Sequence, residues 1–96
     1  MKLYILVRKD LTPSQQAVQA GHALAAFLLR NPNTEWNNGT LIYLGVKNEE
    51  ALEKWKFKLR MKEIKFAEFR EPDMNCETTA IAVYSEERVF KNTELL

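Results

Sequence analysis

Apolar and polar residues follow each other in segments whose length and spacing predict four strands. Two apolar runs, Leu3 to Val7 and Thr40 to Val46, are rich in β-branched and aromatic residues and predict buried strands. Ile64 to Arg70 and Thr78 to Tyr84 predict a third and a fourth strand. Pro72 ends the third strand and only a short turn follows, so the fourth strand is predicted to pair with the third in the antiparallel sense.

The segments between the first three strands predict helices. Thr12 is a suitable N-cap, and Pro13 suits the first position of a helix that runs to about Leu29. Asn48 in turn precedes a second helix, which ends near Met61 or Lys62. A short helix around positions 89 and 90 is predicted in the tail.

The order strand, helix, strand, helix, strand, strand predicts an α/β fold with a mixed four-stranded sheet flanked by helices. A chain of 96 residues can bury one core but not two, so residues 1–96 are expected to form one domain. If the first three strands are parallel, their carboxyl ends meet at one edge of the sheet. That edge is the predicted functional site, and the residues expected there are Asp10, Gln15, Glu71, Asp73, Thr78 and Thr79.

The first helix is predicted to have an apolar side and a polar ridge opposite to it. At about 100° per residue, the apolar side comprises Ala17, Ala20, Leu24, Phe27 and Leu28. The exposed ridge comprises Gln15, Gln19 and His22. After His22 the helix is apolar all round, which predicts burial against more than one layer, or against a second subunit in a homodimer.

The composition of the chain limits the kinds of functional site that it can form. His22 is the only histidine, and the spacing of Asp10, Glu71 and Asp73 matches no metal motif, so neither a metal nor another cofactor is expected. The single cysteine, Cys76, excludes an internal disulfide and favours a reducing compartment such as the cytoplasm. The apolar start of the chain is too short for a signal-peptide core or a membrane span.

Fourteen basic and thirteen acidic residues leave a net charge of +1, so any binding to a polyanion needs a local patch. The densest basic run lies on the second helix, where helical spacing places on one stripe Lys54, Lys58 and Lys62. This stripe is either a solvated surface or a contact for an anionic partner such as an RNA backbone.

The stretch LVRKDLTPSQQAVQAGHA closely resembles the N-terminal signature of the type 2 peptidyl-tRNA hydrolases, V-R-x-D-L followed by M-x-x-G-K and A-x-Q-x-x-H-A. The matching residues, in order and spacing, are Val7, Arg8, Asp10, Leu11, Ala17, Gln19, His22 and Ala23. The resemblance implies a mixed four-stranded sheet, tRNA as a partner, and hydrolysis of the ester that joins a peptide to tRNA. By position, Glu71 corresponds to the family aspartate, for which Asp73 is an alternative, and Thr79 corresponds to the strand threonine.

The chain departs from the family where Ser14 and Gln15 replace the glycine and lysine. Two functions follow. In a hydrolase, His22 activates water, Glu71 or Asp10 orients its imidazole, and Thr79 or Gln15 donates a hydrogen bond to the ester carbonyl. Further substrate contacts are then expected from Arg8, Gln19 and Asp73. In a diverged, non-catalytic member, the same fold binds RNA, an acyl group or a protein partner.

Overall fold

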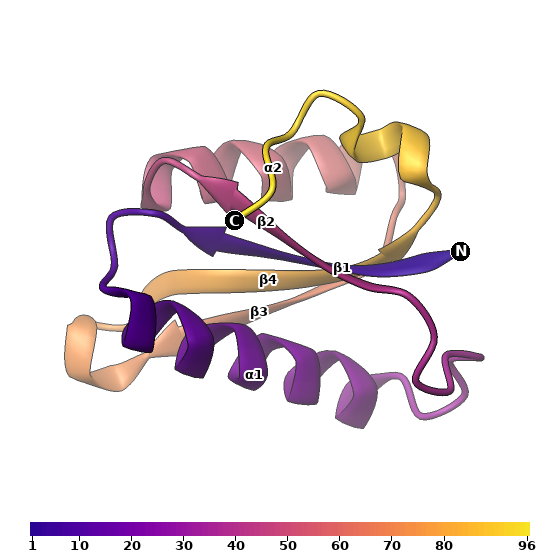
Figure 1. Ribbon diagram of the computed structural model, residues 1–96, viewed down its shortest axis with the longest axis horizontal. Helices are drawn as coiled ribbons and strands as arrows, with labels where there is room; N and C mark the ends of the chain where they lie inside the picture. The colour runs from indigo at the N-terminus through magenta and orange to yellow at the C-terminus, as the bar shows by residue number, and fades with distance from the viewer.

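The computed structural model describes residues 1–96 and contains the predicted elements in the predicted order (Figure 1). The strands are β1 (Lys2–Arg8), β2 (Leu41–Val46), β3 (Phe66–Glu71) and β4 (Glu77–Ser85). The helices are α1 (Pro13–Arg30) and α2 (Glu49–Met61), with short 3₁₀ helices η1 (Pro72–Met74) and η2 (Glu87–Phe90).

The sheet has the strand order β2-β1-β4-β3. β1 is parallel to β2, whereas β4 lies between β1 and β3 and is antiparallel to both. The first three strands therefore point the same way, as predicted, and their carboxyl ends meet at one edge. The mixed four-stranded sheet predicted from the sequence is confirmed.

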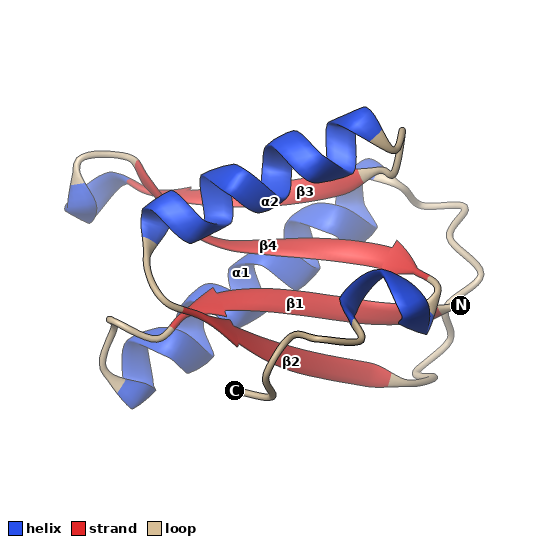
Figure 2. Ribbon diagram, turned by 90° about the horizontal axis from the view of Figure 1, so that it is seen from above, coloured by secondary structure: helices blue, strands red, loops and turns tan.

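Two helical layers cover the sheet, with α1 on one face and α2 together with η2 on the other (Figures 1 and 2). Under α1 the buried core includes Ile5, Ala23, Phe27 and Ala82. Under α2 it includes Leu6, Leu52, Leu59, Ile81 and Phe90. Successive residues of β1 and β4 point to opposite faces, so both strands are buried on both sides.

The prediction of a fully buried second strand is wrong for its first half. β2 is an edge strand, and Leu41 keeps 38% of its surface exposed. Its second half is buried because the end of the chain folds back along it. Gly45 donates to the carbonyl oxygen of Glu94, and Leu96 donates to that of Tyr43.

The predicted orientation of α1 is also wrong in part. Gln19 is only 3% exposed and faces the sheet beside Ala20, whereas Ala17 is exposed. The helix turns this way because the Gln19 amide finds hydrogen-bond partners on the sheet and small alanines let the backbone approach closely. The end of α1 is not buried all round, since Leu29 is 82% exposed, and its burial by a second subunit stays a prediction. Neither helix has the length and apolar character needed to cross a membrane.

Candidate functional site

A hydrogen-bonded row of three side chains joins α1 to the carboxyl edge of the sheet. The Thr79 hydroxyl donates to Gln19 Oε1 at 2.7 Å, and Gln19 Nε2 donates to Glu71 Oε1 at 3.1 Å. Thr79 and Gln19 are buried, whereas Glu71 is half-buried. The row fixes which side of the Gln19 amide is the acceptor and holds the Glu71 carboxylate at a set position.

A β-bulge in β4 aims Thr79 at this row. Phe69 pairs with Ala80, but the next residue, Arg70, pairs with Thr78, so Thr79 is left without a partner on β3. In a regular strand Thr79 would share a face with Ile81, which lies under α2. The extra residue lets Thr79 point to α1 while Thr78 points to α2, a redirection for which bulges near functional sites are known.

His22 lies one helical turn after Gln19 and stays exposed. Its ring stacks on Phe69, with ring centroids 4.3 Å apart and planes only 8° from parallel, and it forms no hydrogen bond within the chain. Phe69 and Glu71 share the face of β3 that is turned toward α1. His22 lies over Phe69, and Gln19 binds Glu71. Alternate residues of a strand are roughly 7 Å apart, a spacing that leaves room for water between His22 and Glu71.

Arg8 closes the same edge beneath the β1–α1 loop. Its guanidinium donates to both carboxylate oxygens of Asp10 at 2.9 Å, to Glu77 at 2.8 Å and to the carbonyl oxygen of Thr78 at 3.2 Å. These hydrogen bonds raise the pKa of Arg8 further above its already high value and lower that of Asp10. Asp10 is thereby engaged with Arg8, which leaves Glu71, the other carboxylate expected in that role, as the group to orient His22.

Gln15 does not lie along the ridge with His22. Thr12 and Gln15 form a capping box at the start of α1, in which the Thr12 amide donates to Gln15 Oε1 at 3.0 Å and the Gln15 amide donates to Thr12 Oγ1 at 3.2 Å. The residue at the family's lysine position therefore caps the helix. Asp73 lies exposed in η1 beyond the end of β3.

The opposite face of the same edge holds a polar cluster that the sequence did not reveal. Lys56 is only 1% exposed and binds Glu53 at 2.8 Å, Glu68 at 2.5 Å and the Thr78 hydroxyl at 3.2 Å. Burial alone would raise the pKa of Glu68, but hydrogen bonds from Lys56 and Arg70 outweigh it and lower the pKa. Lys56 therefore does not belong to a solvated face of α2, although it lies within the basic run of that helix, because three oxygens solvate its ammonium group inside the protein.

The three lysines of the predicted stripe on α2 lie in different surroundings. Lys54 lies 3.6 Å from Glu50, with both side chains largely exposed. Lys58 lies over the Trp55 ring at 4.5 Å and lines a groove beside η2, whereas Lys62 lines a cavity at the far end of the sheet. Their role in RNA binding stays a prediction. No group of three or more metal-binding side chains comes together in the structure.

Comparison with known proteins places the chain in a family. The family model described as Peptidyl-tRNA hydrolase PTH2 matches residues 1–94. A solved structure of a protein of unknown function from Agrobacterium tumefaciens strain C58 has a TM-score of 0.73 at 11% identity, and the match covers 99% of this chain and 96% of that one. At that identity the likeness concerns the fold alone. Among curated proteins, no sequence matches the chain significantly.

Fold and site thus define an α/β protein whose polar residues gather at the carboxyl edge of a mixed sheet, as the sequence predicts. The chain belongs to the peptidyl-tRNA hydrolase PTH2 family. At the level of the family, this supports a peptidyl-tRNA hydrolase-like function.

Proposed function

We propose that the protein hydrolyses the ester between a peptide and tRNA at the edge formed by α1, β3 and β4. The observation that carries the proposal is an accessible, unbonded His22 stacked on Phe69, two residues along β3 from a carboxylate, Glu71, that Gln19 holds in place. An exposed imidazole can take a proton from water near neutral pH, and a fixed carboxylate nearby favours the cation that results. Because the chain belongs to the PTH2 family, the proposed substrate is the ester that joins a peptide to tRNA.

The reaction follows from these positions. His22 removes a proton from a water molecule as the water oxygen bonds to the ester carbonyl carbon, and Glu71 stabilises the imidazolium ion through intervening water. When the tetrahedral intermediate collapses, the bond from that carbon to the ribose oxygen breaks and the imidazolium returns its proton to this oxygen. Gln19 has a second amide hydrogen besides the one donated to Glu71, and this hydrogen is the donor available to the developing oxyanion.

One observation favours a second function. Gln15 replaces the family's lysine and its side chain is held in the capping box, so this position supplies no cation to a phosphate or to an oxyanion. Loss of such a contact costs on the order of 3 kcal/mol in the transition state. A non-catalytic member that binds RNA, an acyl group or a protein partner is the alternative.

Turnover of labelled peptidyl-tRNA by the purified protein distinguishes the two functions. We expect the wild-type protein to release peptide, His22→Ala to abolish release, and Glu71→Gln to lower kcat by roughly 100-fold, the lower end of the range of general acid–base contributions. Glu35→Gln, a matched loss of charge in the loop after α1, is the control and is expected to leave turnover unchanged. A wild-type protein without turnover, together with a Gln15→Lys variant that has it, would establish the binding function.

The proposal places the protein in the cytoplasm, where its substrate is made, and this agrees with a chain whose only cysteine, Cys76, is free. We also propose that two copies associate through the end of α1 beyond His22. Leu29 is 82% exposed there, and a second copy would cover it.

A further inference from the structure

A groove of about 830 Å³ is lined by residues of α2, of η2 and of the last residues of the chain. These elements lie on the face of the sheet away from α1 (Figure 2). Its basic lining comes from three separate elements: Lys47 precedes α2, Lys58 lies on α2, and Arg88 and Lys91 lie on or next to η2. Segments that are distant in the sequence thus bring four cations to one concave surface.

These four cations have no acidic partner. No ion pair of the structure includes Lys47, Lys58, Arg88 or Lys91. The two carboxylates of the groove, in contrast, are already engaged, since Asp10 binds Arg8 and Glu94 binds Lys9, each at 2.9 Å. The groove is therefore strongly positive in a chain whose net charge is only +1, and concave walls of low dielectric strengthen such a local field.

An aromatic side chain lies among these charges. Trp55 lines the groove, is half-buried, and packs on Phe90 with ring centroids 5.0 Å apart. Lys58 lies over its indole, with the ammonium 4.5 Å from the ring centroid. A flexible lysine is easily displaced from this position. Aromatic rings between unpaired cations are the surface on which single-stranded nucleic acids stack their bases.

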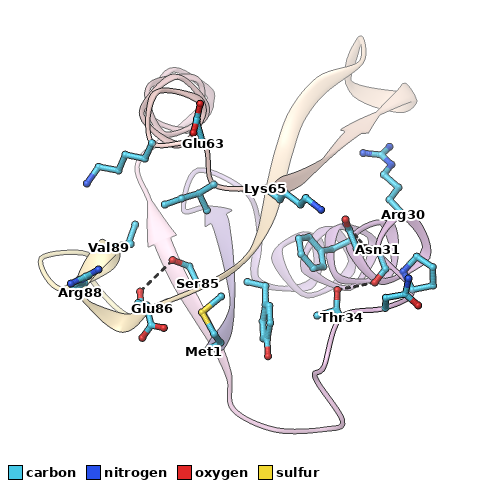
Figure 3. Close-up of a pocket in the computed structure, with 16 residues that line it drawn as sticks. Met1, Arg30, Asn31, Thr34, Glu63, Lys65, Ser85, Glu86, Arg88 and Val89 are labelled. Atoms are coloured by element: carbon cyan, nitrogen blue, oxygen red, sulfur yellow. Dashed lines mark hydrogen bonds between the residues drawn. The ribbon is translucent and has the colours of Figure 1, made fainter.

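The groove is continuous with both ends of the sheet. At one end it includes Lys9 and Asp10, the residues that lead from β1 to the start of α1 and to the candidate site. At the other end Arg88 and Val89 also line a second cavity of about 850 Å³, to which Arg30, Lys62 and Lys65 contribute further cations. Figure 3 shows Arg30 at the end of α1, Lys65 before β3 and Arg88 on η2 around this second cavity.

We infer that the α2–η2 groove binds the phosphate backbone of single-stranded RNA and stacks one base on Trp55. With tRNA as the substrate, an identification that rests on the proposed function, the bound segment is its single-stranded 3′ end. The cations of the groove contact successive phosphates, and the strand leaves past Lys9 toward the ester site. This locates RNA binding in the groove, which Lys58 of the predicted stripe lines, whereas Lys54 lies on the exposed surface of α2.

Binding of deacylated tRNA tests this inference without any ester chemistry. For four phosphate contacts to a single strand, the slope of log affinity against log salt is about −2.8, so affinity falls roughly 50-fold between 50 and 200 mM salt. We expect the double variant Lys47→Gln, Lys91→Gln to reduce the slope to about −1.4 and the fall to roughly 7-fold. Both side chains are exposed, so the fold is expected to be retained.

The matched control is Arg60→Gln, Arg70→Gln, which removes the same charge from exposed positions outside both cavities and is expected to keep the wild-type slope. A second readout uses a Trp36→Phe protein, in which Trp55 is the only tryptophan and its fluorescence is expected to be quenched by a short single-stranded oligonucleotide. Equal slopes for the groove variant and the control, or absence of tRNA binding by the wild type, would overturn the inference.

The outcome is separable from that of the proposed function. A protein that binds deacylated tRNA through the groove but cleaves no ester supports the inference and contradicts hydrolysis. A protein that cleaves peptidyl-tRNA with unchanged efficiency when the groove charges are removed contradicts the inference and leaves hydrolysis intact.

Discussion

Replacing Gln19 by leucine tests whether the row Thr79–Gln19–Glu71 is one coupled unit. Leucine has a similar size and helix propensity but neither donates nor accepts hydrogen bonds. The change removes the acceptor that lies 2.7 Å from the Thr79 hydroxyl and the donor that lies 3.1 Å from Glu71. The carbon skeleton under α1 is otherwise kept.

The two lost partners have unequal costs. Thr79 is fully buried, and the only acceptor that remains for its hydroxyl, the carbonyl oxygen of Phe69, is 3.4 Å away. The hydroxyl then forms only a weak hydrogen bond, which costs about 1–2 kcal/mol of stability. Glu71 is half-buried, and water replaces its donor at a smaller cost, roughly 0.5 kcal/mol. We expect the free energy of unfolding to fall by about 2 kcal/mol in total.

A double-mutant cycle isolates the coupling. Thr79→Val alone leaves Gln19 Oε1 without its donor and is expected to cost about 1–1.5 kcal/mol. In the double variant Gln19→Leu, Thr79→Val no orphaned group remains, so its loss is expected to be about 1–1.5 kcal/mol smaller than the sum of the single losses. Urea unfolding at pH 7, followed by tryptophan fluorescence, measures each value, and a loss of 2 kcal/mol moves the midpoint by roughly 1 M.

Thr34→Val provides the matched control, because this hydroxyl also donates to a backbone carbonyl but lies beyond the other end of α1. Its loss is expected to add to that of Gln19→Leu within about 0.5 kcal/mol. The reasoning would be refuted if the losses of stability caused by Gln19→Leu and Thr79→Val also added within about 0.5 kcal/mol. In that case the two side chains would act independently, and the placement of Glu71 would not depend on the bulge.

Three further outcomes are expected. Arg8 lowers the pKa of Asp10 in the folded protein below its ordinary 3.8, so the unfolded chain binds the Asp10 proton more readily. The stability that the Arg8–Asp10 pair contributes is therefore present above about pH 4 and is lost as the pH falls. Asp10→Asn should therefore make the melting temperature depend less steeply on pH between 2 and 5, and an unchanged curve would contradict this. Lys56→Met should destabilise the fold by about 2–3 kcal/mol in urea, and Glu68→Gln in that background should recover part of the loss, whereas no recovery would argue against an unpaired carboxylate as the cause. Leu29→Glu should shift the sedimentation coefficient from dimer to monomer with the circular dichroism unchanged, and identical sedimentation would exclude this end of α1 as the interface.

The strands and helices were predictable because their signals are local. Thr12 and Pro13 determine where α1 starts, Asn48 caps α2, and Pro72 ends β3, each through its own backbone chemistry. The parallel arrangement of the first three strands also followed from connection lengths, so the edge at which the polar residues meet was found without coordinates. The exposure of Leu41 was not predictable, because edge and central strands have the same apolar composition.

The contacts within the site depend on packing that a helical projection does not contain. Gln19 counts as polar in any such projection, yet it faces the sheet because Thr79 and Glu71 satisfy its amide there. The bulge that turns Thr79 toward α1 has no composition signal, and only the doublet of threonines marks the position. Lys56 was missed for the same reason, because the three oxygens around its ammonium group come from three different elements: Glu53 of α2, Glu68 of β3 and Thr78 of β4.

The same bulge makes backbone amides of β4 that lie close together report on different layers of the protein. The Thr78 amide donates to the Glu49 carboxylate in the first turn of α2, at 2.8 Å, instead of to a neighbouring strand. Local opening of α2 therefore exposes that amide hydrogen to exchange with solvent, while the amides of Ala80 and Ile81, within the sheet, stay protected until the whole fold opens. The exchange rate of a single backbone hydrogen thus measures how often α2 detaches from the edge on which the candidate site is built.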